Sequence, residues 1–320
     1  MAHDGALLVD KPAGLSSFDV VAKLKSAYRK GFGIQRSRDL PKFGHGGTLD
    51  PFATGLLVVA VGEGTKLARY FLGATKGYEF TVQFGQASAS GDSTDPVIQT
   101  SEHLPVSLEE ISRATAAMAA QKPYPMVPPM HSAKKRDGRR LYELAREGIE
   151  IEREPVDVQL HEFQVSRLES PAAHGSVICS AGTYVRVLAQ DLARNLGTVG
   201  MLSALRRTRS GSFQLADALP LDLLIERLSS GVAPETLSSW VPLDHLLTGM
   251  ASVEATADQA VALIQGRQHV LPVIAKKAQL PSPDGDAQLA IYTDQRRLVA
   301  VARRKALEGW ALERVFANRS

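Results

Sequence analysis

The chain contains 320 residues, of which 44% are hydrophobic and 22% charged, and this ordinary globular composition argues against a disordered or fibrous protein. The formal net charge of +3 is too small to indicate a nucleic-acid partner by itself. The single cysteine, Cys179, excludes an internal disulfide framework, and without a membrane-length apolar run or a signal-peptide pattern we expect a cytoplasmic protein.

The first quarter of the chain alternates apolar strands with one helix. The sequence GALLVD predicts a short buried strand, and the helix after it begins at Ser16 or Ser17. Residues 31–47 are polar and rich in glycine, so we expect a mobile loop there. The run GLLVVAVG at 55–62 is continuously apolar and has the length of a strand, which predicts burial on both faces.

The middle of the chain continues the mixed pattern. Alternating apolar residues predict a strand at 78–85, and Ser107 with Glu110 predicts the start of a helix over 108–121. Four prolines within 122–132 require an extended segment, and the segment from Leu141 to Arg146 suits a short helix. A clear apolar stripe predicts a further helix that ends at Gly197.

Two units follow from this pattern. Interleaved strands and helices over about the first 210 residues predict an α/β or α+β fold, and 228–249 is expected to be a connection. After it come a short helix near 256–266 and several short strands, which indicate a small β-rich module. We therefore expect one domain at 1–250 and a second at 251–320.

The charge distribution is more informative than the net charge. Basic residues dominate the segments 23–42 and 131–146 and recur as Arg206, Arg207 and Arg209. Separated basic clusters near aromatic residues suit a surface that follows phosphates, although any one of them alone would be an ordinary solvated face.

Common cofactor and metal motifs are absent from the sequence. There is no GxxxxGK[ST] phosphate loop, no GxGxxG after a strand and no GxSxG elbow, and the histidines lack zinc spacing. The match of Ser132–Lys135 to SxxK has no partner motif, Cys179 suits a buried structural role, and SGDSTDP at 90–96 suits a polar turn. We therefore expect neither a metal nor a cofactor.

One carboxylate is placed differently from the others. Asp50 lies in the glycine-rich segment GHGGTLDP directly before the buried strand, and Pro51 favours an extended conformation there. Such a residue is either a simple turn starter or a nucleophile or base held on a rigid edge. An arginine within reach, such as Arg186, would keep the carboxylate ionised, and Tyr78 could stack on a planar ring.

The segment GHGGTLDPFATGLLVVAVGEGTK resembles the signature of the TruB family of tRNA pseudouridine synthases. LLVDKPAGLSSFDVV, GYEFTVQFGQASASGDSTDP, CSAGTYVRVLAQDLARNLG and LRRTRSG resemble the family's other motifs, in the same order and over most of residues 5–215. The last module resembles a PUA domain. The resemblance implies a mixed, largely antiparallel catalytic sheet followed by a small PUA-like β-barrel.

The resemblance also implies roles for particular residues. Asp50 matches the catalytic aspartate, Arg186 the arginine paired with it, and Tyr78 the tyrosine that stacks on the target uracil. His45 matches a histidine that helps to take the target nucleotide out of its loop. The remaining residues expected at the substrate are Lys11, Tyr184, Leu205, Gly46, Gly47 and Thr48, with the two glycines allowing close approach of an RNA backbone.

The implied activity is conversion of uridine to pseudouridine at position 55 in the T loop of tRNA, by a monomer that needs no cofactor and no protein partner. Two alternatives remain open at this point. One is an RNA chaperone that remodels tRNA, which would have no need of Asp50. The other is a related synthase that acts on another structured RNA, including one that works inside a guide-RNA complex.

Overall fold

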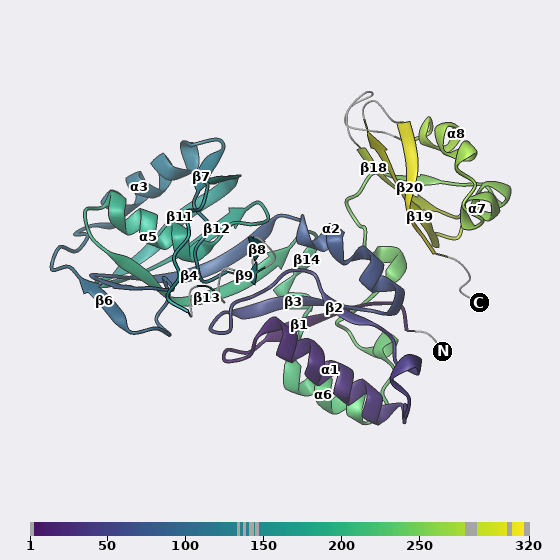
Figure 1. Ribbon diagram of the computed structural model, residues 1–320, viewed down its shortest axis with the longest axis horizontal. Coiled ribbons are helices and arrows are strands. Elements are labelled where there is room, and N and C mark those ends of the chain that lie inside the picture. The colour runs from purple at the N-terminus through teal and green to yellow at the C-terminus, as the bar shows by residue number, and fades with distance from the viewer. Residues whose placement is uncertain are drawn as a thin grey trace.

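The computed structural model describes residues 3–132, 147–278, 287–305 and 309–316, and between them also 135–136, 139–140 and 144. A long sheet crosses the larger part of the molecule, and a smaller unit lies beside one end of it (Figure 1). Within the described residues, this architecture confirms the predicted mixed α/β class. The short helix predicted at Leu141–Arg146 lies outside the described residues, except for Leu144.

Ten strands of the described chain join in the large sheet, whose main path runs β11-β12-β4-β13-β3-β1-β15. Most of its pairs are antiparallel, but β13 pairs with β3, and β1 with β15, in parallel. In path order these strands are Leu160–Glu169, Ala172–Cys179, Lys76–Phe84, Gly200–Ser210, Thr54–Val61, Gly5–Lys11 and Leu219–Pro220. Three short strands join at the side: β2 (Phe43–His45), β14 (Phe213–Gln214) and β16 (Trp240–Pro242).

Helices cover different parts of this sheet. Helices α3 (Leu108–Ala120) and α5 (Val185–Asn195) pack on the half formed by β4, β11, β12 and β13, where they enclose the largest apolar cluster. Helices α1 (Ser17–Gly31) and α6 (Leu221–Ser229) pack against each other and against one face of β1 and β3 (Figure 1).

Helix α1 shows why the local sequence folds as it does. The Ser16 side chain accepts a hydrogen bond from the Asp19 backbone N–H, and Asp19 in turn accepts from the Ser16 backbone, which closes a capping box. The predicted apolar stripe is buried against the sheet, and it comprises Val20, Val21, Leu24, Ala27 and Tyr28.

Strand β3 is apolar throughout because both of its faces are covered. Leu57 and Val59 face α1 and α6. Leu56, Val58 and Ala60 face the short helix α2 (Ala68–Leu72) and the C-terminal unit. The prediction of a doubly buried strand is therefore confirmed.

Two expectations about irregular segments are wrong. The segment 31–47 contains a 3-10 turn at Ser37–Asp39 and the strand β2, which pairs with β3. The expected connection at 228–249 contains 3-10 turns at Pro234–Thr236 and Leu243–His245 and the strand β16, which pairs with β1. Sheet edges and buried contacts elsewhere in the molecule order these segments, and their polar composition does not reveal this.

The smaller unit contains a four-stranded sheet in the order β17-β18-β19-β20, with α7 (Ala257–Ile264) and α8 (Leu271–Ala275) against it. Its strands are Ser252–Glu254, Ala287–Tyr292, Leu298–Lys305 and Gly309–Val315. Among the described residues β17 and β20 do not pair, so the predicted barrel is not closed there. The domain boundary at residue 250 stays a prediction.

The remaining short elements lie at the edges of the large sheet. They are the paired strands β5 (Gln86–Ser88) and β6 (Val97–Thr100), β7 (Tyr124–Met126) and β10 (Val156–Val158), and β8 (Lys135–Arg136) and β9 (Arg139–Arg140), with 3-10 turns at Gly62–Leu67 and Leu215–Asp217. A further 3-10 turn, Gln268–Val270, belongs to the smaller unit. No helix in the described residues is both long and apolar enough to cross a membrane.

Candidate active site

Asp50 lies in the loop that connects β2 to β3. The loop begins where the Gly46 N–H donates to the Val58 carbonyl, and it turns where the Ala53 N–H donates to the Asp50 carbonyl over 3.1 Å. The Pro51 carbonyl accepts from the Gly14 N–H, which fixes the loop to the start of α1. Asp50 is therefore held on a rigid edge, at the point where β3 leaves the loop.

Arg186 reaches Asp50 from the first turn of α5. Its Nε lies 2.9 Å from Asp50 Oδ2 but is poorly aligned for a hydrogen bond, so the contact is an ion pair at one atom. Its two other nitrogens donate to the backbone, Nη1 to Ser90 O at 2.6 Å and Nη2 to His131 O at 2.8 Å. The expected contact is present, but not as a fork of two parallel hydrogen bonds.

A second carboxylate lies behind Arg186. Asp92 Oδ2 is 3.8 Å from Arg186 Nη1, and its Oδ1 accepts from the Thr94 N–H at 3.1 Å. The polar turn predicted at 90–96 is thus formed, and the sequence did not reveal that it also contributes a buried carboxylate. Burial raises the pKa of Asp50 above its ordinary value, Asp92 adds to this, and Arg186 opposes it.

The Asp50 carboxylate opens on a cavity of about 300 Å³ that we call the Asp50 pocket. The pocket brings together most of the residues predicted at the substrate. They are Gly47, Thr48, Asp50, Tyr78, Tyr184 and Leu205. Arg186 is 3% exposed and lies behind the pocket wall, so it acts on Asp50 and not on solvent.

Tyr78 belongs both to the pocket and to the core. It is 9% exposed, shares its face of β4 with Phe80, Val82 and Phe84, and still lines the Asp50 pocket. Burial is the main cause that raises the pKa of its phenol, so Tyr78 presents a neutral ring to the pocket at neutral pH.

Besides Arg186, three predicted residues do not line the pocket: Lys11, His45 and Gly46. Lys11 is fully buried, and its ammonium donates to the carbonyls of Pro12, Leu15 and Pro51, so it stabilises the loop. Burial lowers the pKa of Lys11 to about 8, although Asp50 raises it. Its assignment as a substrate contact stays a prediction.

His45 and Gly46 lie where β2 meets the loop, ahead of Asp50. His45 ends β2 with its Nδ1 buried and unbonded, and burial together with Arg207 lowers the pKa of its ring. A Cβ on Gly46 would lie 2.6 Å from the Phe71 Cβ, so packing inside the protein requires this glycine. Gly47 has a φ of +129°, a conformation that favours glycine.

Two buried cations were not predicted at the site. Arg207, which the sequence suggested as part of a basic surface, is 1% exposed and lines the pocket. Lys76 is 5% exposed and donates to the carbonyls of Phe71 and Ala74. Burial and the nearby Arg207 lower the pKa of Lys76 to about 8. Side chains two residues apart on a strand lie on the same face. Strand alternation therefore predicts Arg207 at the site, because it lies two residues after the pocket residue Leu205.

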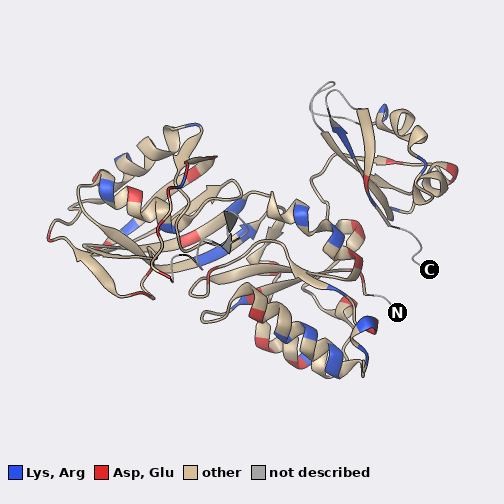
Figure 2. Ribbon diagram, in the orientation of Figure 1, with Lys and Arg blue, Asp and Glu red and all other residues tan. Residues whose placement is uncertain are grey.

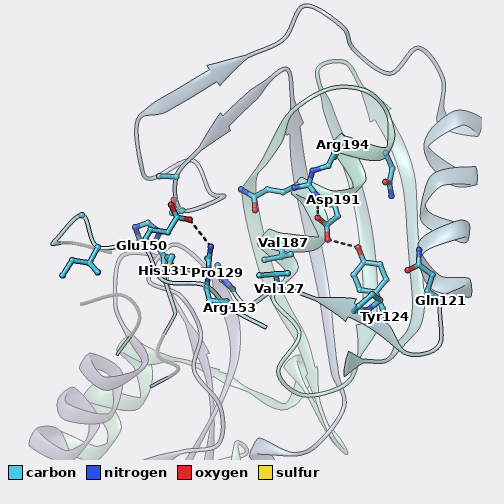
Figure 3. Close-up of a pocket in the computed structure, with 18 residues that line it drawn as sticks. Gln121, Tyr124, Val127, Pro129, His131, Glu150, Arg153, Val187, Asp191 and Arg194 are labelled. Carbon is cyan, nitrogen blue, oxygen red and sulfur yellow. Dashed lines mark hydrogen bonds and ion pairs between the residues drawn. The ribbon is translucent and has the colours of Figure 1, made fainter. Parts of the chain in front are cut away.

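A larger cavity of about 730 Å³ is lined by Val187, Asp191 and Arg194 of α5 and contains none of the predicted residues (Figure 3). Of its two carboxylates, Asp191 accepts from the Tyr124 hydroxyl and pairs with Arg194, both at 2.7 Å, and Glu150 pairs with Arg153 at 3.1 Å. Both oxygens of Asp191 are therefore occupied. We assign the chemistry to the smaller Asp50 pocket for this reason.

Exposed charge is spread over several elements. Helix α1 carries Lys23, Lys25, Arg29 and Lys30 on its exposed side and one acidic residue, Asp19, in its first turn (Figure 2). Arg206 pairs with Asp10 at 2.7 Å, so its side chain lies apart from that of the neighbouring Arg207. No group of three metal-ligating side chains occurs among the described residues.

Comparison with known proteins places the chain in a family. The N-terminal domain model of the TruB family pseudouridylate synthases matches residues 31–185. The tRNA pseudouridine synthase B of Aromatoleum aromaticum is 42% identical over 269 residues, which are 84% of this chain and 82% of the relative. The protein of that name from Neisseria meningitidis is 36% identical over 299 residues, covering 93% of this chain and 90% of the relative.

The fold has a counterpart among solved structures. One chain of a Cbf5-Nop10-Gar1 complex superposes with a TM-score of 0.75 at 24% identity, covering 98% of this chain and 85% of that one. At this identity the likeness supports the fold alone, whereas the sequence relatives carry the assignment. The chain therefore belongs to the TruB family of pseudouridylate synthases.

Proposed function

We propose that this protein isomerises uridine to pseudouridine at position 55 in the T loop of tRNA. The single observation that carries the proposal is the ion pair of Asp50 with Arg186 at a pocket that Tyr78 also lines. The relatives named tRNA pseudouridine synthase B support tRNA as the substrate. The position within tRNA follows from the resemblance of the motifs.

The reaction is an isomerisation and balances without a cofactor. The bond between N1 and C1′ breaks, the uracil turns, and C5 bonds to C1′; C5 then loses its hydrogen and N1 gains a proton. A carboxylate that acts as nucleophile or base is suited to these steps. Asp50 is that group in our proposal, and Arg186 keeps it directed toward the pocket.

The target base must leave its stack before it can enter the pocket, which costs a few kcal/mol. Stacking on Tyr78 offsets part of this cost, since a base on an aromatic ring is worth roughly 1–3 kcal/mol. His45 lies on the same loop as Asp50 and would assist the nucleotide out of its own loop. Residues 251–320 would form a second, PUA-like RNA-binding domain.

A purified preparation tests the proposal directly. The protein alone, as a cytoplasmic monomer would act, is incubated with unmodified tRNA transcript, and pseudouridine is mapped along the RNA. We expect modification at one position in the T loop without added protein, metal or cofactor. Binding without any pseudouridine would instead indicate an RNA chaperone, and modification of a different RNA would indicate a related synthase.

A further inference from the structure

Arg207 occupies the junction between the two halves of the large sheet. In β13 it pairs with Gly55 of β3 on one side and with Tyr78 of β4 on the other. Its side chain is 1% exposed and is among the largest fully buried side chains of the described residues. A charged group in such a place is costly unless hydrogen bonds compensate it.

The guanidinium of Arg207 is compensated by backbone carbonyls on both sides of Asp50. Its Nε donates to Leu56 O at 2.7 Å, its Nη2 to Gly47 O at 3.1 Å and its Nη1 to Thr48 O at 3.3 Å. Gly47 and Thr48 precede Asp50 in the loop, and Leu56 follows it in β3. One side chain thus ties together both ends of the loop that carries the carboxylate.

The strand geometry brings the loop and Arg207 close together. A Cβ on Gly55, whose φ is +98°, would lie 2.3 Å from the Arg207 carbonyl oxygen, so the backbones can approach this closely only at a glycine. No carboxylate pairs with Arg207 in the described part of the chain, where ion pairs form instead at Arg186 and Arg206. The carbonyl bonds are therefore what holds this buried charge.

We propose that Arg207 is a positioning residue for the isomerisation, because it fixes the loop from Gly47 to Leu56 so that Asp50 stays at the pocket and within reach of Arg186. This inference rests on the proposed role of Asp50. It reverses the expectation that Arg207 belongs to a surface that follows phosphates. It also divides the work at the site, since Arg186 contacts the carboxylate, whereas Arg207 holds the backbone of the loop.

The test compares Arg207→Lys and Arg207→Met with the wild-type protein. An ammonium group cannot make the three divergent contacts of the planar guanidinium, and methionine makes none. We expect the single-turnover rate on saturating tRNA to fall by roughly 10–100-fold for lysine and further for methionine. The dissociation constant for tRNA should change by less than about twofold. Arg167→Lys, on the exposed edge strand β11, is the control and should match wild type.

The pH dependence of the rate separates positioning from general stability. A loosened loop exposes Asp50 to water, which returns its pKa toward the ordinary value, so the acidic limb of the pH–rate profile should move to lower pH. A rate loss that disappears when the variants are assayed well below their unfolding temperature, with an unmoved limb, would overturn the proposal.

Other results would also contradict the assignment. Weaker tRNA binding with a smaller salt dependence, at an unchanged saturating rate, would make Arg207 a phosphate contact. A wild-type rate in both variants would show that the carbonyl bonds do not position Asp50. If the wild-type protein itself made no pseudouridine, the proposed function would fail instead, so the two failures are distinguishable.

Discussion

The two cavities that α5 helps to line contain the same kinds of side chain in different arrangements. In the larger one, Tyr124 and Arg194 occupy both oxygens of Asp191 (Figure 3). Asp191 is paired at both oxygens and therefore has little capacity left for a ligand. That arrangement is typical of a structural cluster.

The Asp50 pocket leaves its carboxylate incompletely satisfied. Arg186 contacts one oxygen of Asp50, and its other nitrogens donate to backbone carbonyls. Among the hydrogen bonds of the described residues, none joins Tyr78 to Asp50. The Asp50 side chain keeps 35% of its surface exposed. A partly buried carboxylate with free hydrogen-bonding capacity is what a reaction requires, and the larger volume of the other cavity is no guide to function.

The largest expected effect comes from removing each of the two carboxylates in turn. Asp50→Asn should reduce turnover by at least ~10³-fold, because an amide cannot act as nucleophile or base. Binding of tRNA should persist or tighten, since a negative charge facing a polyanion is lost. Single-turnover rates and dissociation constants measure the two effects separately.

Asp191→Asn is the matched control for that substitution. It should leave the rate within about twofold of wild type but cost roughly 1–2 kcal/mol of unfolding free energy, because the Tyr124 and Arg194 contacts weaken. Turnover near wild type in Asp50→Asn, or a large rate loss in Asp191→Asn, would assign the reaction to the larger cavity instead of the Asp50 pocket.

The second effect separates the two arginines. Arg186→Lys keeps the charge but cannot contact Asp50 and at the same time donate to Ser90 O and His131 O. We expect the saturating rate to fall on the order of a hundredfold, since small displacements at a reacting centre are that costly. Arg194→Lys, on the exposed side of the same helix, should change it little. A fast Arg186→Lys variant beside a slow Arg186→Ala variant would mean that charge alone matters.

A smaller effect is expected from the second carboxylate behind Arg186. The negative charge of Asp92 contributes to the raised pKa of Asp50, so Asp92→Asn should lower that pKa. Asp50 would then stay ionised to lower pH, and the acidic limb of the pH–rate profile should move toward lower pH. Asp95→Asn in the same loop is the control. A limb that moves upward, or equally in both variants, would show that Asp50 is not the titrating group.

The sequence predicts much of the scaffold because local patterns and burial agree there. The capping box at Ser16, the doubly buried strand β3 and the apolar stripe of α5 all depend on near neighbours in the chain. The contact of Arg186 with Asp50 is implied by the family resemblance. Which nitrogen of Arg186 makes this contact depends on the backbone carbonyls that bind the other two nitrogens, and no local sequence pattern specifies these carbonyls.

Other features depend on contacts between distant segments. The strand β16 forms because β1 offers it an edge, and Asp92 is buried because its turn pairs with β13 near Leu202. Arg207 and Arg206 are adjacent in sequence but project to opposite faces of β13, so one is interior and the other pairs with Asp10. A count of charged residues does not distinguish Arg206 from Arg207. Only the alternation of side chains between the two faces of a strand distinguishes them.

The smallest expected effect extends the comparison from buried cations to exposed ones. Arg296 lies at the turn between β18 and β19, is exposed, and stacks 5.0 Å from the ring centroid of Tyr292. If residues 251–320 bind tRNA, Arg296→Gln should weaken binding a few-fold and reduce the dependence of affinity on salt by about one phosphate contact, with the saturating rate unchanged.

Deleting the whole unit is a poorer test of this prediction, because its Tyr292 and Leu298 pack against the sheet residues Leu8 and Val58. Affinity and salt dependence equal to wild type would show that this turn does not touch the RNA, whereas a reduced saturating rate would mean that exposed and buried cations are not separate in function.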